Sequence, residues 1–542
     1  MTQDSPTPTL LCLPNELLRK IASLLPKFTL LRLRCVDRKF ASIATPHAFH
    51  SLRFRAYGDE PERFMHIAES EHLRGFAQEI TCDTWIGPHF EFRHNHDYKI
   101  PSSFFDALPF ISLFHNTKTL NLRFAYDCGG YEALEETPRF RFRILDTIFN
   151  TLAGTWSEDK QREADKGLNF PYYYKYDMGK VPSGISKSLI TLKTLTISNL
   201  EDFNNTKFTT SKAFKAVTNS PSLVDLQLYI ATHTKNFDRE FTTSFPEKYK
   251  MFESLPSTWL RPSVAKHLQT LSLYCHEPWG WYPKMDFRLL DMPNLRVLAL
   301  GNFVFSHQWQ VEWFGSLGIE KFYLDGCSVL FQAFSEMKLD ESSTVLQKPG
   351  AEDVRLSNEG YLARGTRRIG NYYDEAPLQP PIRWHTLLSH WKTSLSNLRV
   401  FKMGLGDWDD APSQTIEAAL HGDPYKSTDP KVARQPFTYN GFRYFDCPTP
   451  EITGSDIFRH GTGIDKGYDD MFDYQYWDDK YESYDSVWEE REDDREDMTE
   501  DDWLEEYGED EARSLEKDAR DKDQAALDLM LSMIEARMMA SK

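Results

Sequence analysis

The sequence predicts an α/β protein in which three short N-terminal helices precede an array of strand-and-helix units and an acidic C-terminal tail. Three observations support this. Apolar residues recur at helical spacing between residues 11 and 54. A six-residue strand pattern occurs six times between residues 192 and 403. The negative charge of the chain is concentrated between residues 465 and 523.

The composition indicates a globular protein. With 542 residues, 40% of them hydrophobic, the chain can form several domains and a large core. The seven cysteines are scattered without a C-x-x-C pair, which predicts reduced thiols and hence the cytoplasm or the nucleus. The first ten residues lack the features of a signal peptide, and the longest apolar run, residues 107–114, is too short to cross a membrane. We expect no membrane association.

The N-terminal region is predicted to form three helices. Pro14 suits the first turn of the first helix, and Pro26 ends it. Thr29 is the expected cap of the second helix, and the third runs from the cap Asp37 to Pro46. The apolar stripes are Leu17, Ile21 and Leu24; Leu30, Leu33 and Val36; and Phe40, Ile43 and Ala44. Such short helices are unstable alone, and the stripes are too broad to be hidden among them, so part of this surface needs a partner.

Residues 11–54 resemble an F-box domain of the fungal type. The resemblance rests on the Leu-Pro-x-Glu-Leu opening at Leu13, a second Leu-Pro at Leu25, Leu-x-x-Leu from Leu30 and Val-x-Arg-x-Phe from Val36. The sequence departs from the usual F-box residues at Thr29, Asp37 and Phe40, but these departures remove no apolar contact. An F-box at residues 10–55 would dock onto the Skp-type adaptor of a cullin–RING ubiquitin ligase. The adaptor-binding residues implied are Leu13, Pro14, Leu17, Ile21, Leu24, Leu30, Leu33 and Val36.

The middle of the chain contains repeated strand-like segments of the form apolar-x-x-apolar-x-apolar. They are Leu192–Ile197, Leu223–Leu228, Leu268–Leu273, Leu295–Leu300, Ile319–Leu324 and Leu398–Met403, with Thr119–Leu122 as a weaker early member. Alternate residues of a strand share one face, so we expect parallel strands with Leu195, Leu226, Leu271, Leu298 and Leu324 buried in one row. Spacings of 24 to 31 residues leave room for a helix between strands, whereas spacings of 45 and 79 imply insertions.

This pattern resembles a degenerate leucine-rich-repeat array, which we assign to residues 56–464. Asn302 and Cys327 stand where that family places a turn residue. An ordinary α/β domain with leucine-rich parallel strands is the alternative. The segments 155–180, 237–262 and 338–381 are interpreted as insertions whose fold the sequence does not specify.

The sequence contains no persuasive catalytic or metal-binding motif. The grouped histidines between His89 and His96 are best explained as a solvated loop. We therefore expect no cofactor, no metal and no enzymatic activity. Trp279, Trp281 and Tyr282 follow a predicted strand and are candidate anchors for a target protein, with core packing as an equally weighted alternative.

The acidic tail is assigned to residues 465–542, and residues 1–9 are expected to be disordered. From Asp465 to Asp523 there are 27 acidic and 8 basic residues, which accounts for the net charge of −19 and argues against nucleic-acid binding. Interleaved aromatic residues predict that residues 468–488 pack on the array while residues 489–523 stay solvated, with helical spacing near Phe472 and an acidic helix at 485–506. Leu527, Met530, Leu531, Ile534 and Met538 form the stripe of a docking helix.

Two hypotheses for function follow. The first is a substrate-recognition subunit of an SCF-type (Skp–cullin–F-box) E3 ubiquitin ligase, whose F-box binds the adaptor and whose array binds an unidentified target protein. The alternative is an adaptor-binding scaffold outside the ligase, or an interaction protein whose array binds something unrelated to ubiquitination. The sequence does not name the target or say whether it must be modified first.

Overall fold

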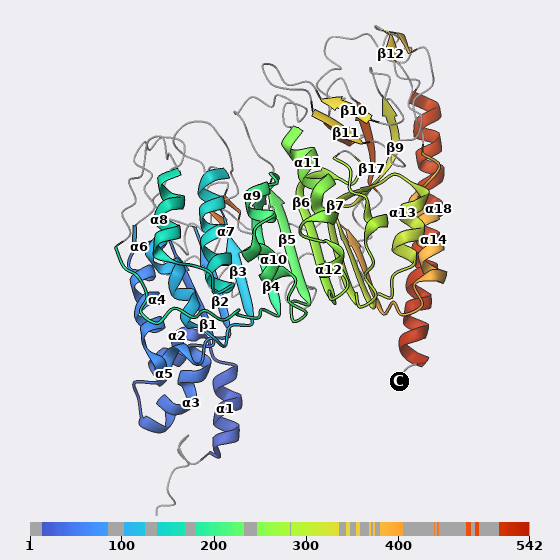
Figure 1. The fold of residues 1–542 in the computed structure, drawn as a ribbon. Coiled ribbons are helices and arrows are strands. Elements are labelled where there is room, and N and C mark those ends of the chain that lie inside the picture. Colours follow the sequence, from blue (N-terminus) through green and yellow to red (C-terminus); the bar gives the residue numbers. More distant parts are fainter. Residues whose placement is uncertain are drawn as a thin grey trace, which may run out of the picture.

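The computed structural model describes residues 13–84, 102–124, 138–167, 179–231, 246–281, 283–334, 343–346, 354–357, 368–369, 372–373, 380–404, 438–439, 442–443, 473–478, 483–486 and 509–540. Three helices, α1 (Asn15–Ser23), α2 (Lys27–Leu33) and α3 (Arg38–Ala48), lie below one end of a large sheet (Figure 1). The three-helix prediction is confirmed, although several of its boundaries are wrong.

The start of α2 and the end of α3 differ from the prediction. Pro26, and not Thr29, is the N-cap of α2, because the Leu30 amide already donates to the Pro26 carbonyl at 3.0 Å. Asp37 caps α3 as predicted, and its carboxylate accepts from the Lys39 amide at 2.6 Å. Pro46 does not stop α3 but lies inside its last turn, where its missing N–H removes a single bond to Ser42, an exposed residue.

Nine parallel strands follow one another across the sheet in chain order. They are β1 (Ser51–Arg55), β2 (Glu79–Asp83), β3 (Thr119–Arg123), β4 (Thr194–Glu201), β5 (Asp225–Ala231), β6 (Thr270–Trp279), β7 (Val297–Phe305), β8 (Lys321–Asp325) and β14 (Val400–Gly404). Each is paired parallel with the next. The predicted parallel strands are therefore present, and β1 and β2 extend the series before the first recognised pattern.

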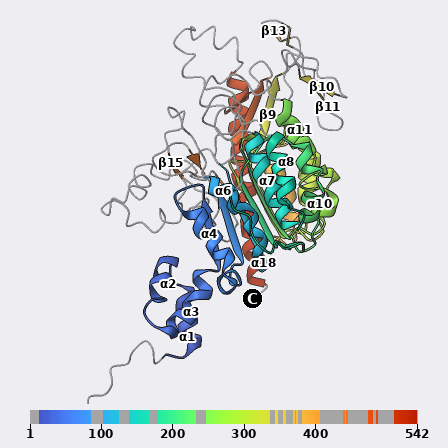
Figure 2. The same ribbon diagram turned by 60° about the vertical axis from the view of Figure 1, so that its left-hand side comes forward.

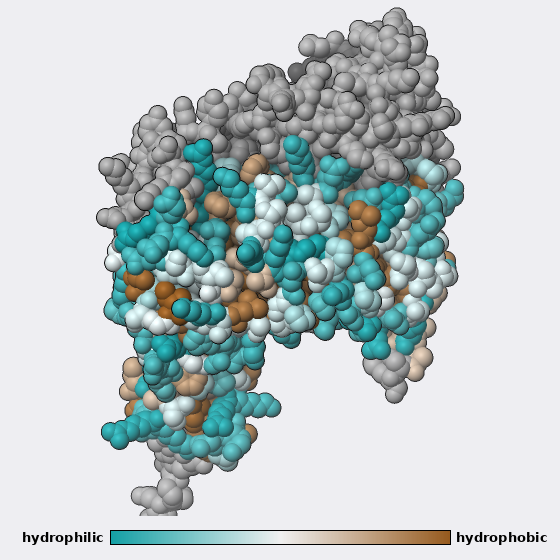
Figure 3. Space-filling model, in the orientation of Figure 1, coloured by the Kyte–Doolittle hydropathy of each residue, from teal (hydrophilic) through white to brown (hydrophobic). Residues whose placement is uncertain are grey.

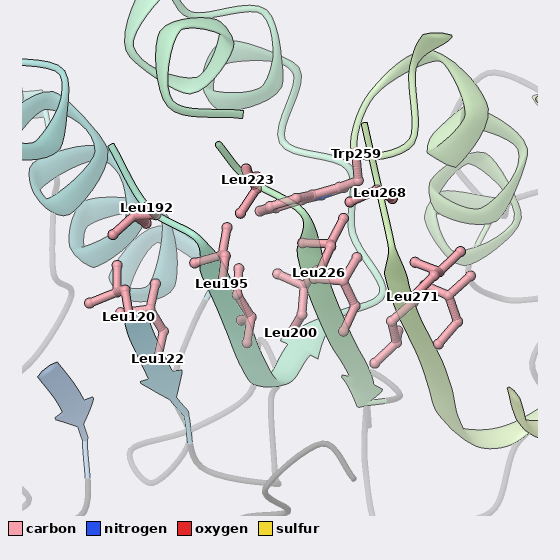
Figure 4. Packing of buried hydrophobic residues seen from close by; sticks show 14 of the residues in the cluster. Leu120, Leu122, Leu192, Leu195, Leu200, Leu223, Leu226, Trp259, Leu268 and Leu271 are labelled. Carbon is pink, nitrogen blue, oxygen red and sulfur yellow. The ribbon is translucent and has the colours of Figure 1, made fainter. Parts of the chain in front are cut away.

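Two rows of apolar side chains cross the sheet in register. The first is Leu52, Ile80, Leu120, Leu195, Leu226, Leu271, Leu298, Phe322 and Phe401. Leu324 belongs to the second row, opposite Leu300, because it stands two residues after Phe322. Figure 4 shows part of both rows packed with the leading residues Leu192, Leu223 and Leu268. Residues between them face the other side, where Tyr229, Tyr274 and Tyr323 form a small second cluster.

The same backbone junction links consecutive strands. A carbonyl just before one strand accepts hydrogen bonds from two successive amides at the start of the next strand, at 2.7 to 3.1 Å. The accepting residues are His50, Gln78, Lys118, Lys193, Val224, Gln269, Arg296 and Glu320. This recurrence at eight junctions shows that the units share one geometry although their sequences and lengths differ.

The helices between strands cover one face of the sheet, as Figures 1 and 2 show from two directions. Successive right-handed crossovers that all advance in one direction put every connection on the same side. The helices are α4 (Glu60–Glu69), α5 (Glu71–Arg74), α6 (Ser102–Ala107), η2 (Leu108–Leu113), α7 (Pro138–Leu152), α8 (Glu158–Gly167), α9 (Thr206–Thr209), α10 (Lys212–Thr218), α11 (Pro246–Ser254), η4 (Leu255–Ser257), α12 (Pro262–Ala265), η5 (Phe287–Leu289), α13 (Gln308–Gly315) and α14 (Trp384–Ser394).

The segments predicted as insertions differ in character. Segment 237–262 contributes α11 and η4, and its Phe252, Leu255 and Trp259 are buried in the main core, so it forms part of the helical layer. Segment 155–180 contributes α8. Segment 338–381 contains two antiparallel hairpins, β10 (Ser343–Leu346) with β11 (Val354–Ser357), and β12 (Arg368–Ile369) with β13 (Tyr372–Tyr373).

The sheet forks at β7. The first half of β7 pairs with β8, and its end pairs with β9 (Ser328–Phe334). Strand β17 (Asp473–Asp478) from the tail lies parallel to β9, and β18 (Ser483–Ser486) is antiparallel to β17. A further hairpin joins β15 (Thr438–Tyr439) and β16 (Phe442–Arg443). Within the predicted segment 468–488, residues 473–478 pair with the sheet as a strand and not at helical spacing; the rest of that segment apart from β18, and most of 485–506, lies outside the described residues.

The terminal helix α18 (Glu509–Ala540) packs against α14 at the end of the array away from the N-terminal helices (Figure 1). Leu527, Met530 and Ile534 are buried and Leu531 is partly buried, which confirms the docking stripe, whereas Met538 is 39% exposed. The expectation that residues up to 523 are solvated is wrong at Asp523, which is fully buried beside His385.

Candidate adaptor-docking surface

The first two helices and the residues just after each of them carry a concentration of exposed apolar side chains. The exposed fractions are 49% for Leu17, 38% for Ile21, 79% for Leu24, 62% for Phe28, 37% for Leu31 and 70% for Val36. We call these six residues the docking surface. Apolar surface is visible on the three-helix region in Figure 3. Leaving several large apolar side chains in water is costly, so grouped exposure of this kind marks an interaction site.

A compact core lies beneath the docking surface. Leu18 and Ala22 of α1 and Leu30 of α2 are buried, in one cluster with Phe40 and Ile43 of α3. The alternation follows from helix geometry, because residues one position from the exposed stripe point inward.

The predicted adaptor-binding residues fall into three groups. Pro14, Leu17, Ile21, Leu24 and Val36 are exposed. Leu13 and Leu33 are partly buried against the core. Leu30 is only 4% exposed, so its side chain supports the surface from below and is not available for direct contact.

Phe28 and Leu31 belong to the docking surface but were missed from the sequence. The predicted cap at Thr29 placed Phe28 in a connection, whereas α2 begins at Lys27. Phe28 lies four residues after Leu24 and three before Leu31, a spacing that could have identified both.

The surroundings of the docking surface are basic. Residues 13–50 contain seven Lys and Arg and two Asp and Glu, in a chain whose net charge is −19. Arg19, Lys20, Arg32 and Arg38 are exposed. The Arg32 guanidinium lies 3.9 Å from the centroid of the Phe28 ring, which is a cation–π contact.

Several contacts fix the three helices relative to the sheet. Only residues 49 and 50 separate α3 from β1, and Phe49 is buried beside the Arg34 guanidinium, 4.7 Å from the ring centroid. Arg34 Nε also donates to Thr45 Oγ1 at 2.9 Å. Lys27 Nζ donates to the Ser51 carbonyl at 2.7 Å, and burial, with the nearby charge of Arg53, lowers the pKa of Lys27. The docking surface is therefore held in one orientation to the sheet.

The two candidate target-binding tryptophans are in the core. Trp279 is 1% exposed, donates from Nε1 to the Gly301 carbonyl at 2.7 Å and packs edge-on against Phe303. Trp281 is also 1% exposed, with its ring centroid 5.4 Å from that of His307. Their burial places both in the core, which is the alternative weighed from the sequence; β6 continues to Trp279, which lies opposite Phe303 of β7 after a shift of register. Tyr282 and the histidines at 89–96 lie outside the described residues.

The described part of the chain was also searched for other kinds of site. It holds no group of three or more His, Cys, Asp or Glu side chains arranged to bind a metal ion. None of its helices is long and apolar enough to cross a membrane.

Three short helices with a shared core and an exposed apolar surface define a small interaction module. The family of F-box domains matches residues 10–51 of the chain. A search of curated proteins gives no match. The chain thus carries an F-box domain, a module that binds Skp-type adaptors within cullin–RING ubiquitin ligases.

Proposed function

We propose that this protein is a substrate-recognition subunit of an SCF-type E3 ubiquitin ligase. In this proposal the docking surface of the F-box binds the adaptor, and the array of parallel strands binds a target protein. The exposed apolar surface within the matched F-box is the observation that carries the proposal.

We further propose that the array is a degenerate leucine-rich-repeat solenoid. Its support is the chain-order parallel pairing, the apolar rows in register and the eight equivalent backbone junctions. In a solenoid each unit contacts its neighbours, and the terminal units need a cap. Helix α18, which covers α14 at one end, fits the role of that cap, and the F-box lies at the other.

Such a protein brings its target close to a ubiquitin-charged enzyme and so raises the effective concentration of the target. The fixed junction between the F-box and β1 suits this role, because a rigid connection keeps a bound target at a constant position relative to the adaptor. The proposed locations are the cytoplasm and the nucleus, in keeping with free Cys35, Cys82, Cys275 and Cys327.

The test is co-purification of the full chain with a purified Skp-type adaptor and cullin. Leu24→Asp places a charge on the most exposed residue of the docking surface, so it should abolish adaptor binding while the circular dichroism spectrum stays unchanged. Leu289→Asp, at a residue 72% exposed in η5, is the matched control and should bind normally.

The outcome separates the two hypotheses. Adaptor binding by Leu24→Asp at wild-type strength would contradict docking through this surface. Adaptor binding without cullin in the complex would favour a scaffold outside the ligase. Proximity labelling from the Leu24→Asp variant, which should hold targets without turnover, would then identify the target.

A further inference from the structure

The exposed pair of Phe28 and Arg32 is an unusual feature of the docking surface. Phe28 is 62% exposed, and the guanidinium of Arg32 lies over its ring at 3.9 Å. The two residues are four apart on α2, so the helix itself sets this contact. Stacking on the ring covers one face of the guanidinium and leaves its N–H edge free.

The cations around the docking surface differ from many others on the molecule. Within the described residues, Arg19, Lys20, Arg32 and Arg38 form no ion pair. Arginines elsewhere are paired, such as Arg63 with Asp59 at 2.8 Å and Arg162 with Glu158 at 2.6 Å. A chain with more acidic than basic residues has therefore left these four F-box cations without an ion pair among the described residues.

We propose that the F-box reads an adaptor surface in which an apolar groove is bordered by carboxylates, and that Arg32, held on Phe28, binds one of them. This inference rests on the proposed function and adds the chemistry of the partner. A guanidinium offers two parallel N–H donors that match a carboxylate, and holding it on an aromatic ring lowers the entropy lost on binding.

Electrostatic complementarity explains why both kinds of group are needed. Apolar contacts of Leu17, Leu24 and Phe28 give affinity without much selectivity, since any apolar groove of the right width would accept them. Basic residues at the rim raise the association rate for an acidic partner and disfavour basic ones.

The experiment measures association and dissociation rates between the full chain and a purified Skp-type adaptor at about 50, 150 and 500 mM NaCl. Arg32→Glu should weaken binding by about tenfold or more at the lowest salt, mainly through a slower association, and the difference should shrink at the highest salt. Arg32→Lys keeps the charge but loses the planar stacking, so its affinity for the adaptor should lie between those of the wild type and Arg32→Glu.

Two controls separate this effect from a general change of charge. Arg63→Glu and Arg162→Glu reverse exposed cations on α4 and α8 and should leave adaptor binding unchanged. Circular dichroism of each variant checks folding, which an exposed side chain such as Arg32 should not affect.

The results also distinguish this inference from the function on which it rests. If the wild-type chain binds the adaptor but Arg32→Glu binds equally well at low salt, the acidic-border proposal is wrong while the adaptor function stands. If the wild-type chain does not bind the adaptor, the proposed function fails first. Loss of binding to anionic vesicles or duplex DNA by Arg32→Glu, with adaptor binding unchanged, would assign the cations to a different partner and overturn the proposal.

Discussion

Asn302 Nδ2 donates a hydrogen bond of 2.9 Å to the backbone carbonyl of Cys275 on the neighbouring strand. Asn199 makes the equivalent bond to the Phe124 carbonyl at 2.8 Å. Both asparagines have positive φ, 55° and 58°, and each lies where the pairing of its strand shifts register. Asparagine side chains inside β4 and β7 therefore join adjacent units, at positions where the backbone departs from regular pairing.

Replacing Asn302 by Ala should lower the free energy of unfolding by about 1–3 kcal/mol, because it leaves the Cys275 carbonyl without this donor and puts a residue poorly suited to positive φ at the turn. Urea denaturation measures the change. Asn302→Gly, which tolerates the backbone conformation, should cost less. Equal losses for both variants would show that strain contributes nothing.

Replacing Leu298 by Ala should cost roughly 2–5 kcal/mol, because the residue is 1% exposed in the middle of the apolar row and a cavity would remain. Leu289→Ala, at a residue 72% exposed, is the matched control and should stay within about 0.5 kcal/mol of wild type. Thermal and urea unfolding both report the difference. An unchanged midpoint for Leu298→Ala would argue that the strands do not unfold as one array.

The stability of the array should depend on pH through His307. Burial lowers the pKa of His307 from 6.5 to about 4. The nearby charge of Arg288 adds to this decrease, and that of Asp286 partly opposes it. Between these values the unfolded chain binds a proton that the folded chain does not, so stability falls as the pH drops from 6.5 to 4. The full shift corresponds to up to about 3 kcal/mol.

His307→Gln should remove this part of the pH dependence. Urea unfolding of wild type and variant at pH 7.5, 5.5 and 4 gives the free energy of unfolding as a function of pH for each protein. Subtracting one of these two curves from the other cancels the contribution of the carboxylates. Parallel curves across this range would mean that His307 does not titrate as its surroundings imply.

The sequence was sufficient to predict much of the sheet, since burial of alternate leucines fixes both the strands and the face they share. It was insufficient for β1 and β2, although Phe49-x-x-Leu52-x-Phe54 and Ala77-x-x-Ile80-x-Cys82 keep the spacing of the pattern: Phe49 to Phe54 fall within the predicted F-box, and Ala77 and Cys82 are small residues in place of leucines. The pairing of β1 with β2 and of β2 with β3 in the structure shows that they belong to the same series.

The docking surface was predictable in part for a different reason. The spacing of Leu17, Ile21 and Leu24 reveals a helical stripe, but spacing alone does not tell which side of α2 faces the core, so Leu30 was assigned outward and Phe28 was missed. Likewise, the sequence pattern of an aromatic residue next to a strand end is the same whether its side chain is exposed or buried. Trp279 lies beyond a register shift between β6 and β7, and this shift depends on residues of both strands. The local sequence around Trp279 therefore does not show that its side chain is buried.

The last prediction concerns how α18 is held. The fully buried Asp523 carboxylate accepts from the His385 amide at 2.7 Å and lies 2.7 Å from its Nδ1, at the N-terminal end of α14, where a negative charge is favoured. Asp523→Asn removes that charge, so α18 should detach more readily and its amides should exchange faster in hydrogen–deuterium exchange. Asp528→Asn changes an exposed carboxylate of the same helix that bonds only Gln524 among the described residues, and it should leave exchange unchanged. If the amides of α18 exchange equally slowly in both variants, the apolar stripe and the hydrogen bonds from Arg537 to the Lys392 and Leu395 carbonyls are enough to anchor the helix, and the Asp523–His385 contact is a consequence of docking and not its cause.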